Sequence, residues 1–119
     1  MEKEFVPYEQ AIDLKELGFD IPCIKYYWTD RTVNRTYETP INHNKKDIVI
    51  SAPLYQQAFR WFREKYKYIG FVLPFGDNLF DYRIYSSDKG EHLIGSTEYD
   101  TCEQAELECL KKLIEITRK

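Results

Sequence analysis

Two apolar segments joined by a short turn constrain the fold of this chain more than any other feature of its sequence. Residues 69–75 are almost entirely apolar, and residues 80–84 alternate between apolar and charged side chains. The turn residues Gly76-Asp77-Asn78 separate them, which is typical of an antiparallel hairpin. A doubly wound nucleotide-binding fold is therefore excluded, because its parallel strands are connected by helices.

Three segments have the periodicity of helices. Residues 7–17 begin with a first-turn proline and are followed by Gly18, a common stop signal. Residues 53–67 follow Ser51, a plausible N-cap, and carry a wide apolar face that includes Trp61. The third helix begins after Asp100 or Thr101 and has a broad buried face, formed by Cys102, Ala105, Cys109, Leu110, Leu113 and Ile114.

The remaining periodic segments predict strands. Residues 23–29 alternate, with aromatic side chains on both faces, and residues 91–97 form a polar edge strand after the turn Asp88-Lys89-Gly90. The fold class is α+β, with three helices packed on a small, mainly antiparallel sheet of three to four strands. The expected order is α-β-loop-α-β-β-(β)-α. The 119 residues are expected to form a single domain, 1–119.

Residues 30–47 have no usable period and are rich in Thr, Asn, Asp and Lys. A weak hairpin around Asn34-Arg35 is one alternative to an irregular loop. We expect this loop to be held mainly at its ends and to contact a partner, because long loops in small domains are often functional. The alternative is a solvated insertion with no role. Its candidate partner-binding residues are Arg35, Tyr37 and His43.

Charge and composition narrow the classes of partner. The net charge is −3, with acidic and basic residues mixed along the chain, so nucleic acid is a disfavoured partner. No stretch approaches the about 20 apolar residues that span a bilayer, and the N-terminus lacks the apolar run of a signal peptide. These features predict a cytoplasmic protein with no membrane partner.

No known catalytic or metal-binding motif is present in the sequence. The cysteines Cys23, Cys102 and Cys109 show no paired spacing and fit buried, reduced thiols. A nucleophile built from Cys23 and either His43 or His92 is the weaker alternative. We therefore expect no enzymatic activity, no catalytic residues, no cofactor and no metal site.

The segment 60–68 interleaves basic and aromatic residues. On a helix, Arg60, Arg63 and Lys67 point outward while the aromatic residues turn inward, so a solvated basic face is the simplest interpretation. The order of elements after Pro53 is similar in outline to the double-stranded-RNA-binding domain. However, the last helix opens with acidic residues where that family presents lysines to phosphate.

Three segments resemble a family of small uncharacterised proteins encoded by phages and prophages of Bacteroides-like bacteria. They are EFVPYEQAIDLKELGFDIPC at 4–23, ISAPLYQQAFRWFREKY at 50–66 and YDTCEQAELECLKKLIEI at 99–116, and together they cover under half the chain. The resemblance implies a phage-associated context in a bacterial host, with no established activity. Residues 29–47 lie outside it.

The leading hypothesis is a non-enzymatic accessory protein of phage or prophage origin that binds a macromolecular partner, either an unidentified protein or a second copy of itself. One alternative is a small-ligand protein that binds or sequesters a nucleotide-like molecule through Trp28, Trp61 and nearby arginines. A second alternative is a nucleic-acid-binding module that uses Arg60, Arg63 and Lys67, for which affinity falling steeply with salt is the discriminator.

Overall fold

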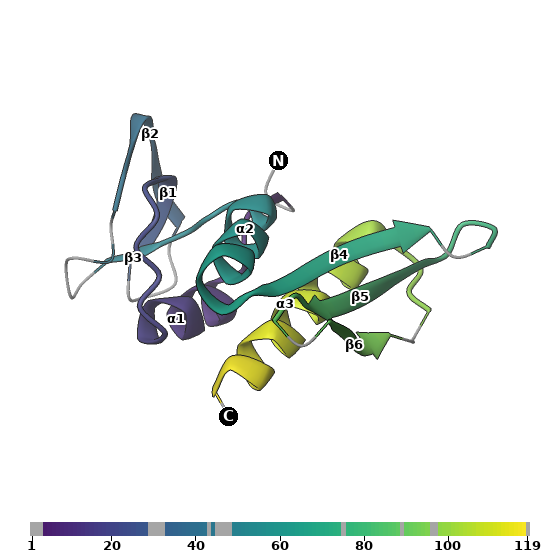
Figure 1. Cartoon of the computed structure of the whole chain (residues 1–119). Coiled ribbons are helices and arrows are strands. Elements are labelled where there is room, and N and C mark those ends of the chain that lie inside the picture. Colours follow the sequence, from purple (N-terminus) through teal and green to yellow (C-terminus); the bar gives the residue numbers. More distant parts are fainter. Residues whose placement is uncertain are drawn as a thin grey trace. The chain divides into compact units, whose positions relative to one another are not determined.

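The chain is an α+β protein. The computed structural model describes residues 4–28, 33–42, 44, 49–74, 76–88, 90–95 and 98–118. The helices and strands of this part of the chain are α1 (Tyr8–Glu16), β1 (Cys23–Trp28), β2 (Val33–Ile41), β3 (Val49–Ser51), α2 (Tyr55–Tyr66), β4 (Tyr68–Pro74), β5 (Phe80–Ser86), β6 (Glu91–Gly95) and α3 (Cys102–Arg118) (Figure 1). Its contacts divide it into two compact units, 1–57 and 58–119, which are described separately.

Helix α1 confirms the first predicted helix, including its stop at Gly18. Gly18 adopts φ 95°, its N–H donates to the Lys15 carbonyl at 3.0 Å, and the Phe19 N–H donates to the Leu14 carbonyl at 2.9 Å. This is the Schellman arrangement, which needs a left-handed residue after the helix and so favours glycine. Leu14 and Phe19 are both buried, so the turn also closes over the core of this unit.

Strand β1 is the central strand of the first sheet, whose order is β2-β1-β3 with both pairings antiparallel. Its Cys23, Tyr26 and Tyr27 are buried, in keeping with the aromatic character predicted on both faces. Tyr27 donates its hydroxyl hydrogen to the Val6 carbonyl at 2.8 Å. The buried Lys25 places its ammonium 4.3 Å from the centre of the Phe5 ring, a cation–π geometry that offsets part of its desolvation.

The expectation of an irregular loop over residues 30–47 is wrong for its central part. Residues 33–41 form β2, an edge strand paired with β1. The register shifts twice, and Pro40 lies where the pairing jumps from Thr36 to Ile41. Proline is tolerated at edges and bulges, where no ladder N–H is needed, so its presence does not forbid a strand there.

A single sheet was expected, whereas the described residues form two sheets. The second sheet is antiparallel, in the order β4-β5-β6. The predicted turn is confirmed between β4 and β5, where Gly76 and Asn78 adopt φ 68° and 59°. The predicted edge strand over residues 91–97 is confirmed over Glu91–Gly95, which form β6. The expectation of a single domain stays a prediction.

Helix α3 packs across β4 and β5 on one face of the second sheet (Figure 1). Thr101 caps it, because its hydroxyl oxygen accepts the Gln104 N–H at 3.1 Å. Of the predicted apolar face, Cys102 is only half-buried, whereas the other members are buried: Ala105, Cys109, Leu110, Leu113 and Ile114. Among the described residues, no helix is both long enough and apolar enough to cross a membrane.

Gly70 of β4 sits directly beneath α3. A Cβ atom at this position would lie 2.9 Å from Leu113 Cδ1 and 3.0 Å from Cys109 Sγ. Both distances are shorter than ordinary van der Waals contact, so Leu113, Cys109 or the helix itself would have to shift to make room for a side chain here. The glycine therefore sets how closely α3 approaches β4.

Replacing Gly70 with alanine should lower the free energy of unfolding by about 1–3 kcal/mol, because the added methyl overpacks the contact with Leu113. Urea unfolding of the parent and Gly70→Ala measures this. In a Leu113→Ala background the same substitution should cost less, since the obstructing Cδ1 atom is gone. Equal costs in the two backgrounds would contradict the steric account.

Candidate binding surface

Helix α2 carries the candidate binding residues Arg60 and Arg63, and Lys67 follows directly after it. The start of the helix differs slightly from the prediction. The predicted cap, Ser51, instead ends β3, where its N–H donates to Asn44 Oδ1 at 2.8 Å. The helix begins at Tyr55, after Leu54, whose N–H donates to Gln57 Oε1 at 2.9 Å. A side chain at the third helical position that reaches back to the preceding backbone N–H is one half of a capping box.

The predicted phase of α2 is confirmed by the burial of its side chains. Ala58, Trp61 and Phe62 are buried, and Trp61 meets Phe62 edge-on with ring centroids 5.1 Å apart. The residues predicted to point outward, Arg60, Arg63 and Lys67, are all exposed. Arg60 and Arg63 therefore lie on the exposed side of α2, and the exposed Lys67 follows directly after the last residue of the helix.

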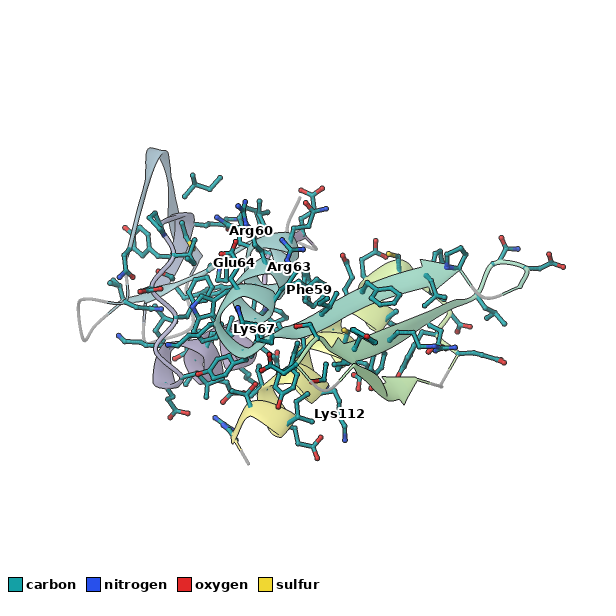
Figure 2. The ribbon with its side chains drawn as sticks, in the orientation of Figure 1. Phe59, Arg60, Arg63, Glu64, Lys67 and Lys112 are labelled. Atoms are coloured by element: carbon teal, nitrogen blue, oxygen red, sulfur yellow. The ribbon has the colours of Figure 1, made fainter. Side chains whose placement is uncertain are left out.

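We call Arg60, Arg63, Glu64 and Lys67 the α2 basic face (Figure 2). Glu64 pairs with Arg60 at 3.1 Å between Oε2 and Nε, and both side chains are well exposed, at 58% and 70%. Lys67 Nζ lies 3.5 Å from the Glu64 carbonyl. Among the described residues, none forms a hydrogen bond or ion pair with the Arg63 guanidinium. The face is thus positive overall, with one carboxylate among its cations.

The backbone conformation of Lys67 is unusual for a residue other than glycine. It adopts φ 64°, in the left-handed region, directly after α2 ends. Glycine is the usual residue at such a position because a Cβ atom is strained there. The Lys67 carbonyl accepts hydrogen bonds from the Ser87 N–H at 2.9 Å and the Ser87 hydroxyl at 3.1 Å, which hold the junction between α2 and β4.

The roles of Glu64, in the α2 basic face, and of Lys65, next to it in the sequence, were not predicted from the sequence. Glu64 could have been found from its spacing to Arg60, because residues four apart on a helix are neighbours. The exposed Lys65 places its ammonium 5.1 Å from the Trp61 ring centre and 5.7 Å from that of Tyr66, so it covers aromatic rings. Trp61 and Lys65 are also four residues apart on the helix, so this contact too could have been found from the sequence.

The other three candidate residues belong to the first unit. Arg35 lies in β2, where its backbone is paired opposite Tyr26 of β1. Tyr37 lies in the same strand, between the paired positions Thr36 and Ile41. His43 lies outside the described residues. Arg35 and Tyr37 therefore belong to a paired strand rather than to the irregular loop that was expected.

The thiols do not have the properties of catalytic nucleophiles. Burial raises the pKa of Cys23 and of Cys109 to about 12 each. Burial also raises the pKa of Cys102, with further contributions from the charges of Glu106 and Glu103. None of the three cysteines is in a disulfide bond. A cysteine nucleophile reacts as the thiolate, which these surroundings disfavour at neutral pH.

The part of the chain that the structure describes holds no group of three or more His, Cys, Asp or Glu side chains placed to bind a metal ion. Of the two histidines considered as bases, His92 lies in β6 and His43 lies outside the described residues. The described geometry thus offers no metal site.

The order of elements predicted after Pro53 is observed. The segment from α2 to α3 has the order helix, three antiparallel strands, helix. The start of α3 is acidic, with Glu103 exposed and Glu106 and Glu108 half-buried. Carboxylates at this end repel phosphate, so the α3 surface does not support RNA binding.

Comparison with protein-family models, with curated proteins and with solved structures yields no significant match to this chain. The resemblance to phage-encoded proteins therefore stays a prediction.

Trp61→Ala should lower the free energy of unfolding by about 3–5 kcal/mol, because Trp61 is buried on the inner side of α2. Arg60→Ala, the matched change on the outer side, removes only an exposed ion pair and should cost at most about 0.5 kcal/mol. Thermal or urea unfolding of the two variants gives the comparison. Similar losses for both would mean that the helix phase is wrong.

A thiol reagent should label the native protein slowly at neutral pH. Cys102 should react first because it is only half-buried, whereas Cys23 and Cys109 should react after unfolding. Since the raised pKa keeps the thiols neutral, the rate should still be rising with pH above 9. Mass spectrometry of labelled peptides over time assigns each rate. Rapid native labelling of Cys23 or Cys109 would contradict the burial described above.

Proposed function

We propose that this chain is a non-enzymatic binding protein whose α2 basic face binds an acidic patch on a partner protein. The observation that carries the proposal is the exposure of Arg60 and Arg63 on one side of α2, with the exposed Lys67 directly after the helix and with Arg63 making no ion pair among the described residues. Exposed arginine is enriched at protein interfaces, where its planar fork binds carboxylates with two hydrogen bonds.

The backbone of Lys67 supports this proposal. Glycine at this left-handed position would remove the strain, yet the chain has a lysine there. A strained residue at the end of a surface helix is a reason to look for a role of its side chain in binding. The Lys67 ammonium, 3.5 Å from the Glu64 carbonyl, adds a third positive charge near the end of the helix.

Glu64 favours a protein partner over nucleic acid. Its carboxylate lies beside Arg60 and would face the phosphates of any nucleic acid bound along the helix. A protein surface with mixed charges can place a cation opposite Glu64, whereas a phosphate backbone offers only negative charge. The net charge of −3 on the whole chain acts in the same direction. The phage-associated context and a bacterial cytoplasm as the site of action are part of this proposal.

Capture from a lysate of a bacterial host, followed by binding of the purified partner, tests the proposal. Arg60→Ala/Arg63→Ala should weaken binding at least about tenfold, or about 1.4 kcal/mol, because two carboxylate-binding groups are lost. Lys111→Ala/Lys112→Ala removes the same charge from α3, where both lysines pair within the helix, and should change affinity little. A protein held equally by both variants, or one lost after nuclease treatment, would contradict the proposal.

Lys67→Gly provides a variant that separates binding from stability. It should leave stability unchanged or raise it by up to about 1 kcal/mol, because the left-handed backbone suits glycine. It should still weaken partner binding through loss of the ammonium. Asn78→Gly, which makes the same backbone change in the β4–β5 turn, is the matched control and should affect stability alone.

A further inference from the structure

The second sheet has one edge that differs from the other strand edges of this chain. In the order β4-β5-β6, β5 is central and β4 is an edge, and within the described residues no strand pairs with the other side of β4. The edge strands β2 and β6 both contain charged residues, and β3 spans only Val49–Ser51. By contrast, β4 has the sequence YIGFVLP, which contains no charge. Charges on edge strands discourage pairing with other chains, so β4 lacks this protection.

The register shows which backbone groups of β4 face outward. Phe80 exchanges two hydrogen bonds with Tyr99, at 2.9 and 2.7 Å, so its N–H and carbonyl point away from its partner Pro74. In an antiparallel pair, hydrogen-bonded and non-bonded positions alternate. The same geometry recurs at every second residue before Pro74, which gives Val72, Gly70 and Tyr68. The N–H and carbonyl groups of these three residues therefore point to the open side of β4. Ile69, Phe71 and Leu73 bond to β5.

The side chains of β4 add an apolar row to this open edge. Gly70 faces α3, so Phe71 lies on the opposite face of the sheet, together with Ile69 and Leu73. Phe71 is 39% exposed, and among the described residues it is the one large apolar side chain that is exposed to solvent. An exposed aromatic side chain beside unpaired backbone groups is the combination that strand addition uses.

We propose that β4 pairs antiparallel with β4 of a second copy of this chain, with Phe71 of each copy opposite Phe71 of the other. In this register Tyr68 faces Pro74 of the other copy and Gly70 faces Val72, so the outward N–H groups of Tyr68, Gly70 and Val72 all find carbonyls. Pro74 lacks an N–H but offers its carbonyl.

A second copy fits this edge for reasons of charge and packing. Two β4 strands bring no charge together, since neither contains one. The two-fold axis places both Phe71 rings on the same outer face, where each ring removes apolar surface of the other from water. The neighbouring register, with Gly70 opposite Gly70, would leave no side-chain contact at the axis. The dimer uses surface distinct from the α2 basic face.

Sedimentation equilibrium of the purified chain tests for the dimer. The mass should rise from monomer to dimer with concentration. Val72→Pro removes one outward N–H without removing a bond to β5, and should weaken dimerisation at least about tenfold. Val72→Ala, which shortens the same side chain and keeps the N–H, should stay close to the parent. Circular dichroism checks that each variant is folded.

Cross-linking decides the register and remains informative if Val72→Pro does not fold. In a Cys102→Ser background, Phe71→Cys should form an intermolecular disulfide on mild oxidation, because facing non-bonded residues have Cα atoms about 4.5 Å apart. Asp77→Cys, exposed in the turn beyond β4, should not. A folded chain that stays monomeric at all concentrations, or a dimer that neither cross-links through Phe71→Cys nor responds to Val72→Pro, overturns the proposal. Because no other protein is present, these results are independent of the partner bound by α2.

Discussion

The close contact between helix α3 and strand β4 at Gly70 is the interaction on which the arrangement of residues 58–119 depends. The absence of a side chain at Gly70 lets Leu113 and Cys109 rest on the strand itself. Because side chains alternate along a strand, this contact decides which face of β4 is inward and leaves Phe71 outward. The exposed apolar row of β4 follows from that choice.

Local chemistry was enough to predict the helices and the β4–β5 hairpin. Each depends on residues close together in sequence, such as Gly18 after α1, Thr101 before α3 and the turn at 76–78. The exposed basic side of α2 was predicted for the same reason, since helical spacing alone separates Arg60 and Arg63 from Trp61. The left-handed backbone of Lys67 could not be predicted, because lysine has no preference for it.

The remaining features depend on pairings between distant residues. Strand β2 was missed because its residues do not alternate and its pairing with β1 is interrupted where Pro40 lies, features that local patterns assign to loops. The short strand β3 pairs with β1, which lies more than 20 residues before it in the sequence, and no local pattern indicates this partner. The division into two sheets, and with it the open edge of β4, follows from these choices of partner. For this reason the sequence alone predicted one sheet.

Hydrogen exchange of the β4 amides, measured residue by residue, tests the central claim that β4 is an edge open on one side. In dilute solution the amides of Phe71 and Leu73 should be protected by β5, while those of Gly70 and Val72 exchange quickly. At high concentration Gly70 and Val72 should become protected as well, because the second copy covers them. If in dilute solution the amides of Phe71 and Leu73 were protected no more than those of Gly70 and Val72, the account would be contradicted.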